Sequence, residues 1–112
     1  MTDTHKAMLV MTTVDSAELA ATIATALVEQ RLAACVQEMP IRSHYRWEGS
    51  VQSDVETLLF VKTSPQSTAA AMDAIRMLHP YDVPEIIALP VTDGLPAYLD
   101  WIRTESPGAG TS

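Results

Sequence analysis

The sequence predicts an α+β fold in which two strand–helix–strand units build one antiparallel sheet with helices on one face. Three observations predict it. Apolar residues with helical spacing follow a short apolar run near the start of the 112-residue chain. Two long segments rich in strand-forming residues then meet at Glu48-Gly49, and a second helix with a clear start signal precedes a last apolar run. The predicted order is β-α-β-β-α-β, followed by a short C-terminal helix.

The first strand and the first helix are predicted in the N-terminal third of the chain. The run over residues 7–13 is short and apolar and ends in β-branched residues, as is typical of a buried strand. Asp15 followed by Glu18 matches a capping box, and Ser16 is an alternative N-cap. The helix over about residues 16–31 has a core-facing stripe, made of Ala20, Ile23, Ala24, Leu27 and Val28.

Two long strands are predicted in the middle of the chain, over residues 34–47 and 51–63. Pro40 has no N–H to donate to a strand ladder, so it implies either an edge position or a bulge. The second of these strands is half-polar at its start and apolar on both faces towards its end. We therefore expect it to run from an exposed region into the core.

The tip of this hairpin is predicted at Glu48-Gly49, because glycine readily adopts the positive φ angles of tight turns. Tyr45 and Trp47 lie two residues apart and are expected on one face. A strand of about 14 residues spans roughly 46 Å, whereas the first helix covers only roughly 24 Å, so the hairpin must overhang the helices. An overhanging aromatic ribbon with a free edge is an association hazard unless another chain covers it. We expect an obligate oligomer that is joined through the hairpin.

The second half of the chain repeats the helix–strand order. A helix is predicted over residues 65–78, since Ser64-Pro65 is a cap followed by proline at the first helical position. It must stop before Pro80, because the residue before a proline avoids helical angles. A strand over residues 85–91 follows, and Pro96 opens the C-terminal helix. Together these elements predict the ferredoxin-like sandwich.

The length and the ends of the chain predict a single domain over residues 7–105. Residues 1–6 are polar and are expected to be flexible. Residues 106–112 have nothing apolar to bury and are expected to form a disordered tail.

Composition excludes several partners. The formal net charge of −7 argues against a nucleic-acid partner, which needs clustered Lys and Arg. The single cysteine, Cys35, cannot form an intramolecular disulfide and fits a reducing compartment. No basic and apolar leader begins the sequence, and no apolar run approaches membrane-spanning length. We therefore expect a cytoplasmic protein without a membrane partner.

Several short motifs occur in order on the expected elements. They are Ala33-Ala34-Cys35, Tyr45-Arg46-Trp47-Glu48-Gly49, Lys62-Thr63, His79-Pro80-Tyr81, Pro84-Glu85, Leu89-Pro90-Val91 and Tyr98-Leu99-Asp100-Trp101. In these motifs the chain resembles the CutA-type divalent-cation tolerance proteins. The resemblance implies a tight homotrimer, similar in architecture to the PII nitrogen-signalling proteins. It also implies a role in tolerance of divalent metals, copper in particular, without an established enzymatic activity or a known downstream partner.

Three residues are candidate metal ligands. Cys35 matches a cysteine of the family, and as a thiolate it would suit Cu(I) or Zn, although a small buried side chain that only packs is the alternative. His79 would be joined by an acid, Glu85 or Asp82, or by residues of another chain. The alternative for His79 is a histidine that is favoured by the C-terminal end of a helix. We expect copper or zinc as the ion and no organic cofactor.

A second set of polar and aromatic residues is expected at a cleft between subunits, where interface packing and ligand binding are not exclusive. The set is Tyr45, Trp47, Glu48, Lys62 and Tyr81. The runner-up function is a PII-like sensor that binds a small molecule or nucleotide in this cleft, where Lys62 and Arg46 would meet a phosphate. An enzyme is not expected, because the loop after the first strand lacks the arginine of an acylphosphatase and no Ser-His-Asp or Cys-His arrangement is supported.

Overall fold

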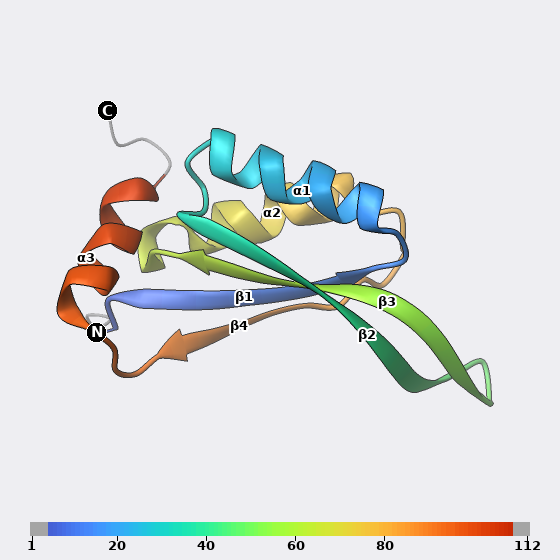
Figure 1. Ribbon diagram of the computed structural model, residues 1–112. Coiled ribbons are helices and arrows are strands. Elements are labelled where there is room, and N and C mark those ends of the chain that lie inside the picture. Colours follow the sequence, from blue (N-terminus) through green and yellow to red (C-terminus); the bar gives the residue numbers. More distant parts are fainter. Residues whose placement is uncertain (1–4, 109–112) are drawn as a thin grey trace.

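A four-stranded antiparallel sheet carries two helices on one face and a third helix at one end (Figure 1). The computed structural model describes residues 5–108. The elements in chain order are β1 (Ala7–Val14), α1 (Ala17–Glu29), β2 (Cys35–Trp47), β3 (Ser50–Thr63), the 3-10 helix η1 (Pro65–Ser67), α2 (Thr68–Leu78), β4 (Ile86–Val91) and α3 (Pro96–Glu105). The predicted α+β, βαββαβ architecture with an extra C-terminal helix is confirmed.

Local signals set the helix ends. The Ser16 side chain accepts the backbone N–H of Leu19 at 3.0 Å, so the cap of α1 is the serine and not the capping box that Asp15 would open. Arg31 adopts a φ of 59°, and the chain leaves α1 there. Ser64 and Pro65 start a short 3-10 turn, and α2 continues from it to Leu78 as predicted.

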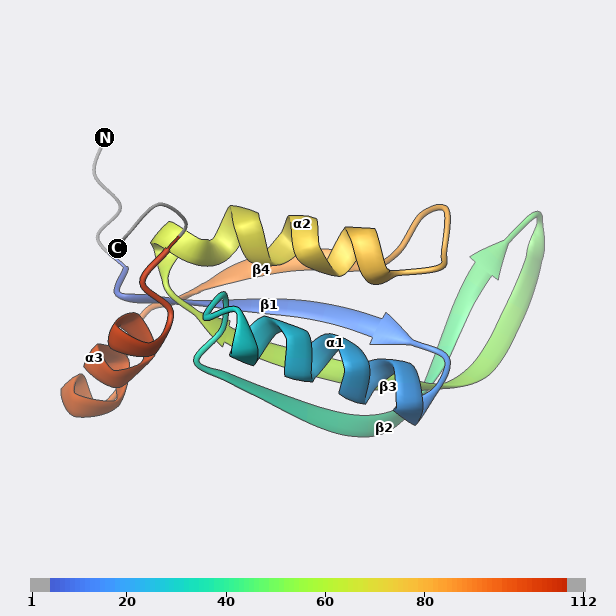
Figure 2. The ribbon, with the colours of Figure 1, turned by 90° about the horizontal axis from the view of Figure 1, so that it is seen from above.

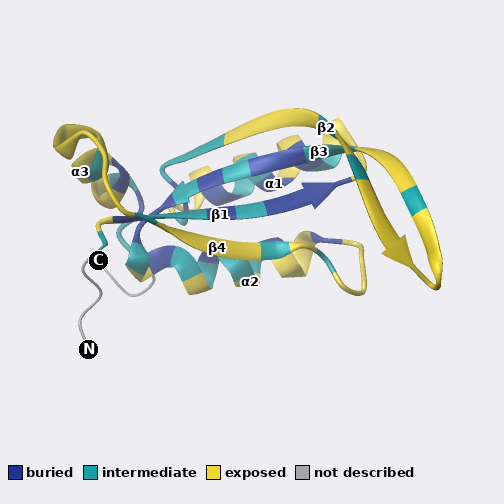
Figure 3. Cartoon of the chain, turned by 90° about the horizontal axis from the view of Figure 1, so that it is seen from below, coloured by how far each residue is buried: buried dark blue, intermediate teal, exposed yellow. Residues whose placement is uncertain are grey.

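The core lies between the sheet and the two helices α1 and α2. Val10 and Val14 of β1 and Leu59 and Val61 of β3 alternate along their strands, so their side chains point to the same face. They are fully buried against the apolar faces of α1 and α2, which contribute Ala20, Ile23, Leu27, Ala71 and Ile75. The opposite face of the sheet carries no helix over most of its length, and we call it the open face (Figure 3).

Proline positions agree with the strand order β2-β3-β1-β4, which makes β2 and β4 the two edges. The ladder between β2 and β3 continues without interruption through Pro40 opposite Thr57, so the edge alternative is correct and the bulge alternative is wrong. Pro90 lies in β4, the other edge strand. An edge strand tolerates a proline because the missing N–H can face outwards, where no neighbouring strand needs a donor.

The hairpin of β2 and β3 extends beyond the rest of the sheet, as expected from strand length. Pairing of β1 with β3 ends at Val14 opposite Thr57, whereas β2 and β3 remain paired to Trp47 opposite Ser50. Beyond the end of β1 the ribbon bends out of the plane of the sheet and curves to the side of the loop between α2 and β4 (Figure 2). Most of this ribbon is exposed (Figure 3). The longest dimension of the chain is 44 Å.

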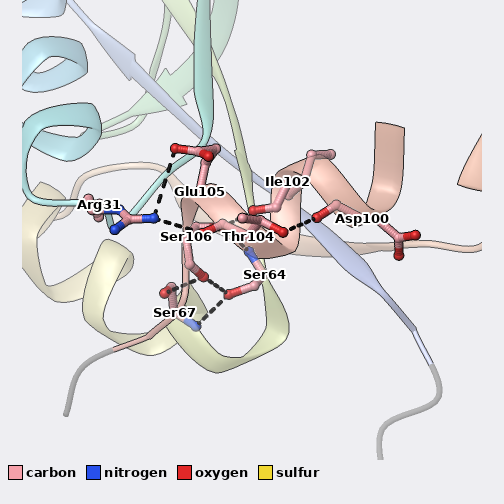
Figure 4. A network of polar contacts seen from close by, with 8 residues as sticks. All are labelled: Arg31, Ser64, Ser67, Asp100, Ile102, Thr104, Glu105 and Ser106. Carbon is pink, nitrogen blue, oxygen red and sulfur yellow. Dashed lines mark hydrogen bonds and ion pairs between the residues drawn. The ribbon is translucent and has the colours of Figure 1, made fainter. Parts of the chain in front are cut away.

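The end of α3 is attached to η1 by a buried serine network (Figure 4). The backbone carbonyl of Ser106 accepts hydrogen bonds from the hydroxyl groups of Ser64 and Ser67. The Ser106 hydroxyl accepts the Ser64 N–H at 3.0 Å, and all three serines are fully buried. On the outside, the Arg31 guanidinium donates to the Thr104 carbonyl at 2.8 Å. Polar contacts with two distant parts of the chain thus hold α3 in place.

This network corrects the predicted boundary of the C-terminal tail. Ser106 was expected to begin a disordered tail because it has no apolar side chain, but it is buried through hydrogen bonds instead. Residues 109–112 lie outside the described residues, and so do residues 1–4 of the expected flexible N-terminus. For those residues the expectation stays a prediction. In residues 5–108, no helix has the length and apolar character that crossing a membrane requires.

Candidate functional site

The register of the hairpin decides which side chains share each of its two faces. Tyr45 lies opposite Gln52, and Ile41 lies opposite Glu56, so these positions point to the open-face side of the ribbon together with Asp54. The expectation that Tyr45 and Trp47 share one face agrees with this register. Arg42, His44 and Arg46 alternate with them and point to the other face, so the ribbon has a basic face and an acidic face.

Two tyrosines and two carboxylates form a cluster on the open-face side of the overhanging hairpin. The Tyr45 hydroxyl donates to the Asp54 carboxylate, which raises the pKa of Tyr45, because ionisation would lose the bond and place two negative charges together. Tyr81, from the loop between α2 and β4, lies close enough to feel the charge of Glu56. Burial, followed by the charges of Asp15 and Glu56, raises the pKa of Tyr81 to about 12. Both phenols are therefore neutral hydrogen-bond donors at physiological pH.

His79 positions the loop that carries Tyr81. Its ring is 8% exposed, and its Nε2–H donates to the carbonyl oxygen of Thr13 at 2.7 Å. Its Nδ1 accepts the backbone N–H of Tyr81 at 3.3 Å, and the two rings contact edge to face at 4.6 Å between centroids. Because a carbonyl oxygen can only accept, the ring is the Nε2–H tautomer and both nitrogens are used. His79 thus has no free nitrogen for a metal in this arrangement.

The three predicted metal ligands do not meet within one described chain. Cys35 begins β2 opposite Lys62, which pairs with Leu9, whereas His79 contacts Thr13 four residues farther along β1. That separation is about 13 Å along the strand. Glu85 is exposed and lies next to the start of β4, at the His79 end. Over residues 5–108, no group of three or more His, Cys, Asp and Glu side chains is placed to hold a metal ion.

The predicted cleft residues fall into two regions of a single chain. On the overhanging hairpin, Tyr45 lies near Tyr81 of the loop between α2 and β4, and Trp47, 51% exposed, and Glu48 follow at the tip. Lys62 lies at the opposite end of the sheet, where its ammonium group donates to the Tyr98 hydroxyl at 3.1 Å. One chain therefore presents two separate polar and aromatic sites, and neither contains the whole predicted set.

The sequence interpretation missed Asp54, Glu56 and Tyr98 as members of these sites. The two carboxylates could have been found from the turn alone, because a two-residue loop at Glu48-Gly49 fixes every opposing pair of the hairpin. Counting back from the turn places both carboxylates on the Tyr45 face. Tyr98 gave no comparable signal, since its contact with Lys62 joins residues 36 positions apart.

Comparison with known proteins gives consistent matches. A family model described as CutA1 divalent ion tolerance protein matches residues 8–105. The chain is 52% identical over 96 residues to the divalent-cation tolerance protein CutA of Thermus thermophilus, covering 85% of this chain and 93% of that protein. It is 41% identical to the chloroplastic protein CutA of Arabidopsis thaliana over 92% of this chain, but spans only 57% of that protein.

Solved structures show the same fold. The divalent cation tolerance protein Cut A1 from Thermus thermophilus superposes with a TM-score of 0.86 at 50% identity, over 89% of this chain and 98% of that chain. The periplasmic divalent cation tolerance protein CutA from Archaeoglobus fulgidus also gives 0.86, at 37% identity, over 89% of this chain and 98% of that chain. The matched region includes the overhanging hairpin and both sites described above.

Proposed function

The chain belongs to the CutA1 divalent ion tolerance protein family, and we propose that it acts in tolerance of divalent cations, copper among them, by binding them rather than by catalysing a reaction. The observation that carries the proposal is the 52% identity to a divalent-cation tolerance protein over 93% of its length. A single cysteine supports a reducing, cytoplasmic location. Fractionation of cells that produce the tagged chain tests this location.

We propose further that the working form is a homotrimer of PII-like architecture. Support comes from the overhanging hairpin, whose pairing with β1 has ended and whose Tyr45 and Trp47 side chains are about half-exposed, at 42% and 51%. The open face adds Ile87 and Leu89, at 48% and 42%. Exposed apolar strands with a free edge are disfavoured in a soluble monomer, so a second and third copy are the natural cover.

Assembly also bears on where a cation would bind. A lone thiol or carboxylate holds a transition metal weakly, and the three predicted ligands are separated within the chain. Cys35 and Glu85 remain accessible donors, since neither is fully buried. We propose that Cys35 and Glu85 of different copies supply thiolate and carboxylate ligands at the subunit boundaries, and that His79 serves the loop structure.

Calorimetric titration of the metal-free protein with Cu²⁺ and Zn²⁺ tests this proposal. We expect Cys35→Ala and Glu85→Gln to weaken cation binding at least tenfold. Cys35→Ser should give an intermediate affinity, and Asp73→Asn, an exposed control, should leave the affinity unchanged. Unchanged isotherms for Cys35→Ala and Glu85→Gln would remove these residues from the site. Absence of any cation binding by the assembled protein would contradict the function itself.

The sensor alternative requires Lys62 and Arg46 to lie close together, which only assembly of several copies would achieve. Lys62 lies at one end of the sheet and Arg46 lies on the overhanging hairpin, so the two cations expected to meet a phosphate are far apart in a single chain. Only a neighbouring copy would bring them together. A thermal-shift series with ATP and ADP in the presence of Mg²⁺ tests it, and lack of stabilisation at millimolar ligand counts against a nucleotide.

A further inference from the structure

The basic face of the overhanging hairpin lies on the helix side of the sheet. Val61 and Leu59 of β3 point into the core, and alternation along the strand places Val55, Ser53 and Val51 on the same side. Beyond the end of β1, no helix within residues 5–108 covers this side of the ribbon (Figure 2). The basic face is opposite to the aromatic face through which the copies are proposed to join. It therefore lies outside the proposed interface.

Two rows of side chains run along the basic face. Three basic residues of β2 form the first row: Arg42, His44 and Arg46. Consecutive members are two residues apart, which is about 6–7 Å along a strand. The facing positions of β3 add two apolar side chains, Val51 and Val55, which are 68% and 63% exposed. Both are more exposed than the aromatic side chains on the opposite face, so a cationic row lies beside an exposed apolar row.

The cations of this face are not neutralised by carboxylates of the same chain. Arg42 donates to Ser53 Oγ at 3.3 Å and Arg46 donates to the Gly49 carbonyl at 3.4 Å, which uses one of the five N–H groups of each guanidinium. In the ion pairs of residues 5–108, neither arginine has a carboxylate partner. The carboxylates of the tyrosine cluster lie on the opposite face. In a chain of formal net charge −7, the basic face is therefore a local positive patch with donors left for an anion.

We propose that the basic face binds an acidic segment of another protein, in which a row of carboxylates lies beside a row of apolar side chains. Carboxylates on successive turns of a helix are about 5–6 Å apart, close to the spacing of the cationic row. Guanidinium groups bind carboxylates through paired, charge-assisted hydrogen bonds, and Val51 and Val55 pack against the apolar row.

The charge of the chain favours a protein segment over other anionic partners. Two arginines on a chain of net charge −7 are too few to hold the dense charge of a nucleic acid or of an anionic membrane. This binding needs no metal ion and goes beyond the proposed role in cation tolerance. It rests on the proposed assembly only in that the copies join through the opposite face of the hairpin.

Fluorescence anisotropy of a labelled helical peptide, with a row of glutamates beside a row of leucines, tests the proposal on the metal-free protein. We expect saturable binding that weakens as the salt concentration is raised. The same peptide with glutamine in place of every glutamate should bind at least tenfold more weakly. The double variant Arg42→Glu, Arg46→Glu should also lose at least tenfold in affinity for the acidic peptide. The control Lys6→Glu, Arg76→Glu makes the same change of charge at two exposed positions elsewhere and should leave the affinity unchanged.

A milder variant keeps the test decisive if charge reversal disturbs the fold. Arg42→Gln with Arg46→Gln removes both charges without adding new ones, so it should weaken binding by a smaller factor. Light scattering should give the mass of the parent protein for both arginine variants, because the basic face is opposite to the proposed interface. Loss of assembly in these variants would place the basic face between copies and overturn the proposal.

Three further results would each overturn it. They are equal binding of the glutamate and glutamine peptides, unchanged binding in both arginine variants, and tighter binding of single-stranded DNA or of phosphatidylserine vesicles than of the acidic peptide. Cation titrations should give the same isotherm with and without the peptide. The proposed cation binding and the proposed peptide binding can therefore fail independently.

Discussion

His79 connects two backbone segments that are far apart in the sequence. Its Nε2–H donates to Thr13 at the end of β1, and its Nδ1 accepts the N–H of Tyr81 in the loop before β4. A histidine placed in this way determines where Tyr81 lies and so brings it near Tyr45 and Glu56 of the overhanging hairpin. Neither alternative of the sequence analysis, a histidine favoured by the helix end or a metal ligand, included this connection between two backbone segments.

Replacing His79 should therefore cost stability. His79→Ala leaves the buried Thr13 carbonyl and the partly buried Tyr81 N–H without their partner, and the unpaired carbonyl alone costs about 1–3 kcal/mol. Urea denaturation measures the change. His44→Ala, an exposed histidine on the hairpin, is the matched control and should stay within about 0.5 kcal/mol of the parent. Equal stability of the two variants would show that the bonds of His79 contribute little.

Tyr81 links stability to alkaline pH. Its folded pKa, about 12, lies above the ordinary value of 10.0, so the folded state holds the phenolic proton more tightly than the unfolded chain does. The stabilisation is complete below pH 10 and is lost as the pH rises from 10 to 12. We expect the free energy of unfolding to fall less steeply across this interval in Tyr81→Phe. Parallel curves for the two proteins would contradict the assignment.

At the scale of the elements, the hairpin turn combines one residue that adopts positive φ easily with one that does not. Both loop residues have positive φ, 50° for Glu48 and 80° for Gly49, as a type I′ turn requires. Glycine adopts this conformation freely, but a glutamate does so at a cost of about 1–2 kcal/mol. A Cβ atom at Gly49 would meet nothing within 4 Å, so conformation alone decides the effect of a substitution there.

Two substitutions in this turn should have opposite effects. Gly49→Ala should lower the stability by about 1 kcal/mol, and Glu48→Asn should raise it by roughly 0.5–1 kcal/mol, because asparagine tolerates positive φ. Thermal unfolding followed by circular dichroism measures both. The same sign of change in the two variants would be inconsistent with this turn geometry.

The attachment of α3 is the second property at this scale. Ser106→Ala removes the hydroxyl that accepts the Ser64 N–H, which leaves a buried donor unpaired at a cost of about 1–3 kcal/mol. Hydrogen exchange of α3 amides should speed up in this variant. Thr104→Ala removes a hydroxyl from an exposed position of the same helix and serves as control. Unchanged exchange in Ser106→Ala would mean that the bonds to the carbonyl of residue 106 and the bond from Arg31 to Thr104 hold α3 without the hydroxyl.

At the scale of the whole molecule, the hairpin and the open face predict self-association. Light scattering should give three times the 12.2 kDa mass of the chain. Trp47→Asp places a charge at an exposed aromatic position of the hairpin and should shift the protein towards monomer, whereas the exposed control Asp73→Asn should not. A monomeric parent protein at micromolar concentration would contradict the assembly.

The fold of this chain could be predicted from its sequence more completely than its sites. Periodicity, prolines and turn residues identified the strands and the α-helices, with ends displaced by one or two residues for β1, α1, β2, β3 and β4. The first three residues of the helix predicted over residues 65–78 instead form the 3-10 turn η1. The separation of Cys35 from His79 and the pairing of Tyr45 with Asp54 were not identified. The separation depends on register across the whole sheet, which short-range patterns along the chain do not contain. The contact of Tyr45 with Asp54, in contrast, follows from the register that the two-residue turn at Glu48-Gly49 sets.

The sequence by itself determined the order of the elements and the overhang of the hairpin, because these follow from local backbone preferences and from length. It also limited Pro40 to two positions, a sheet edge or a bulge. Only the tertiary structure decided that Pro40 lies on an edge, that His79 uses both ring nitrogens for backbone groups, and that Ser106 is buried. The physical reason is that each of these contacts joins segments distant in sequence. Whether a polar group is used for structure or is free for a ligand depends on the partner that the fold brings to it.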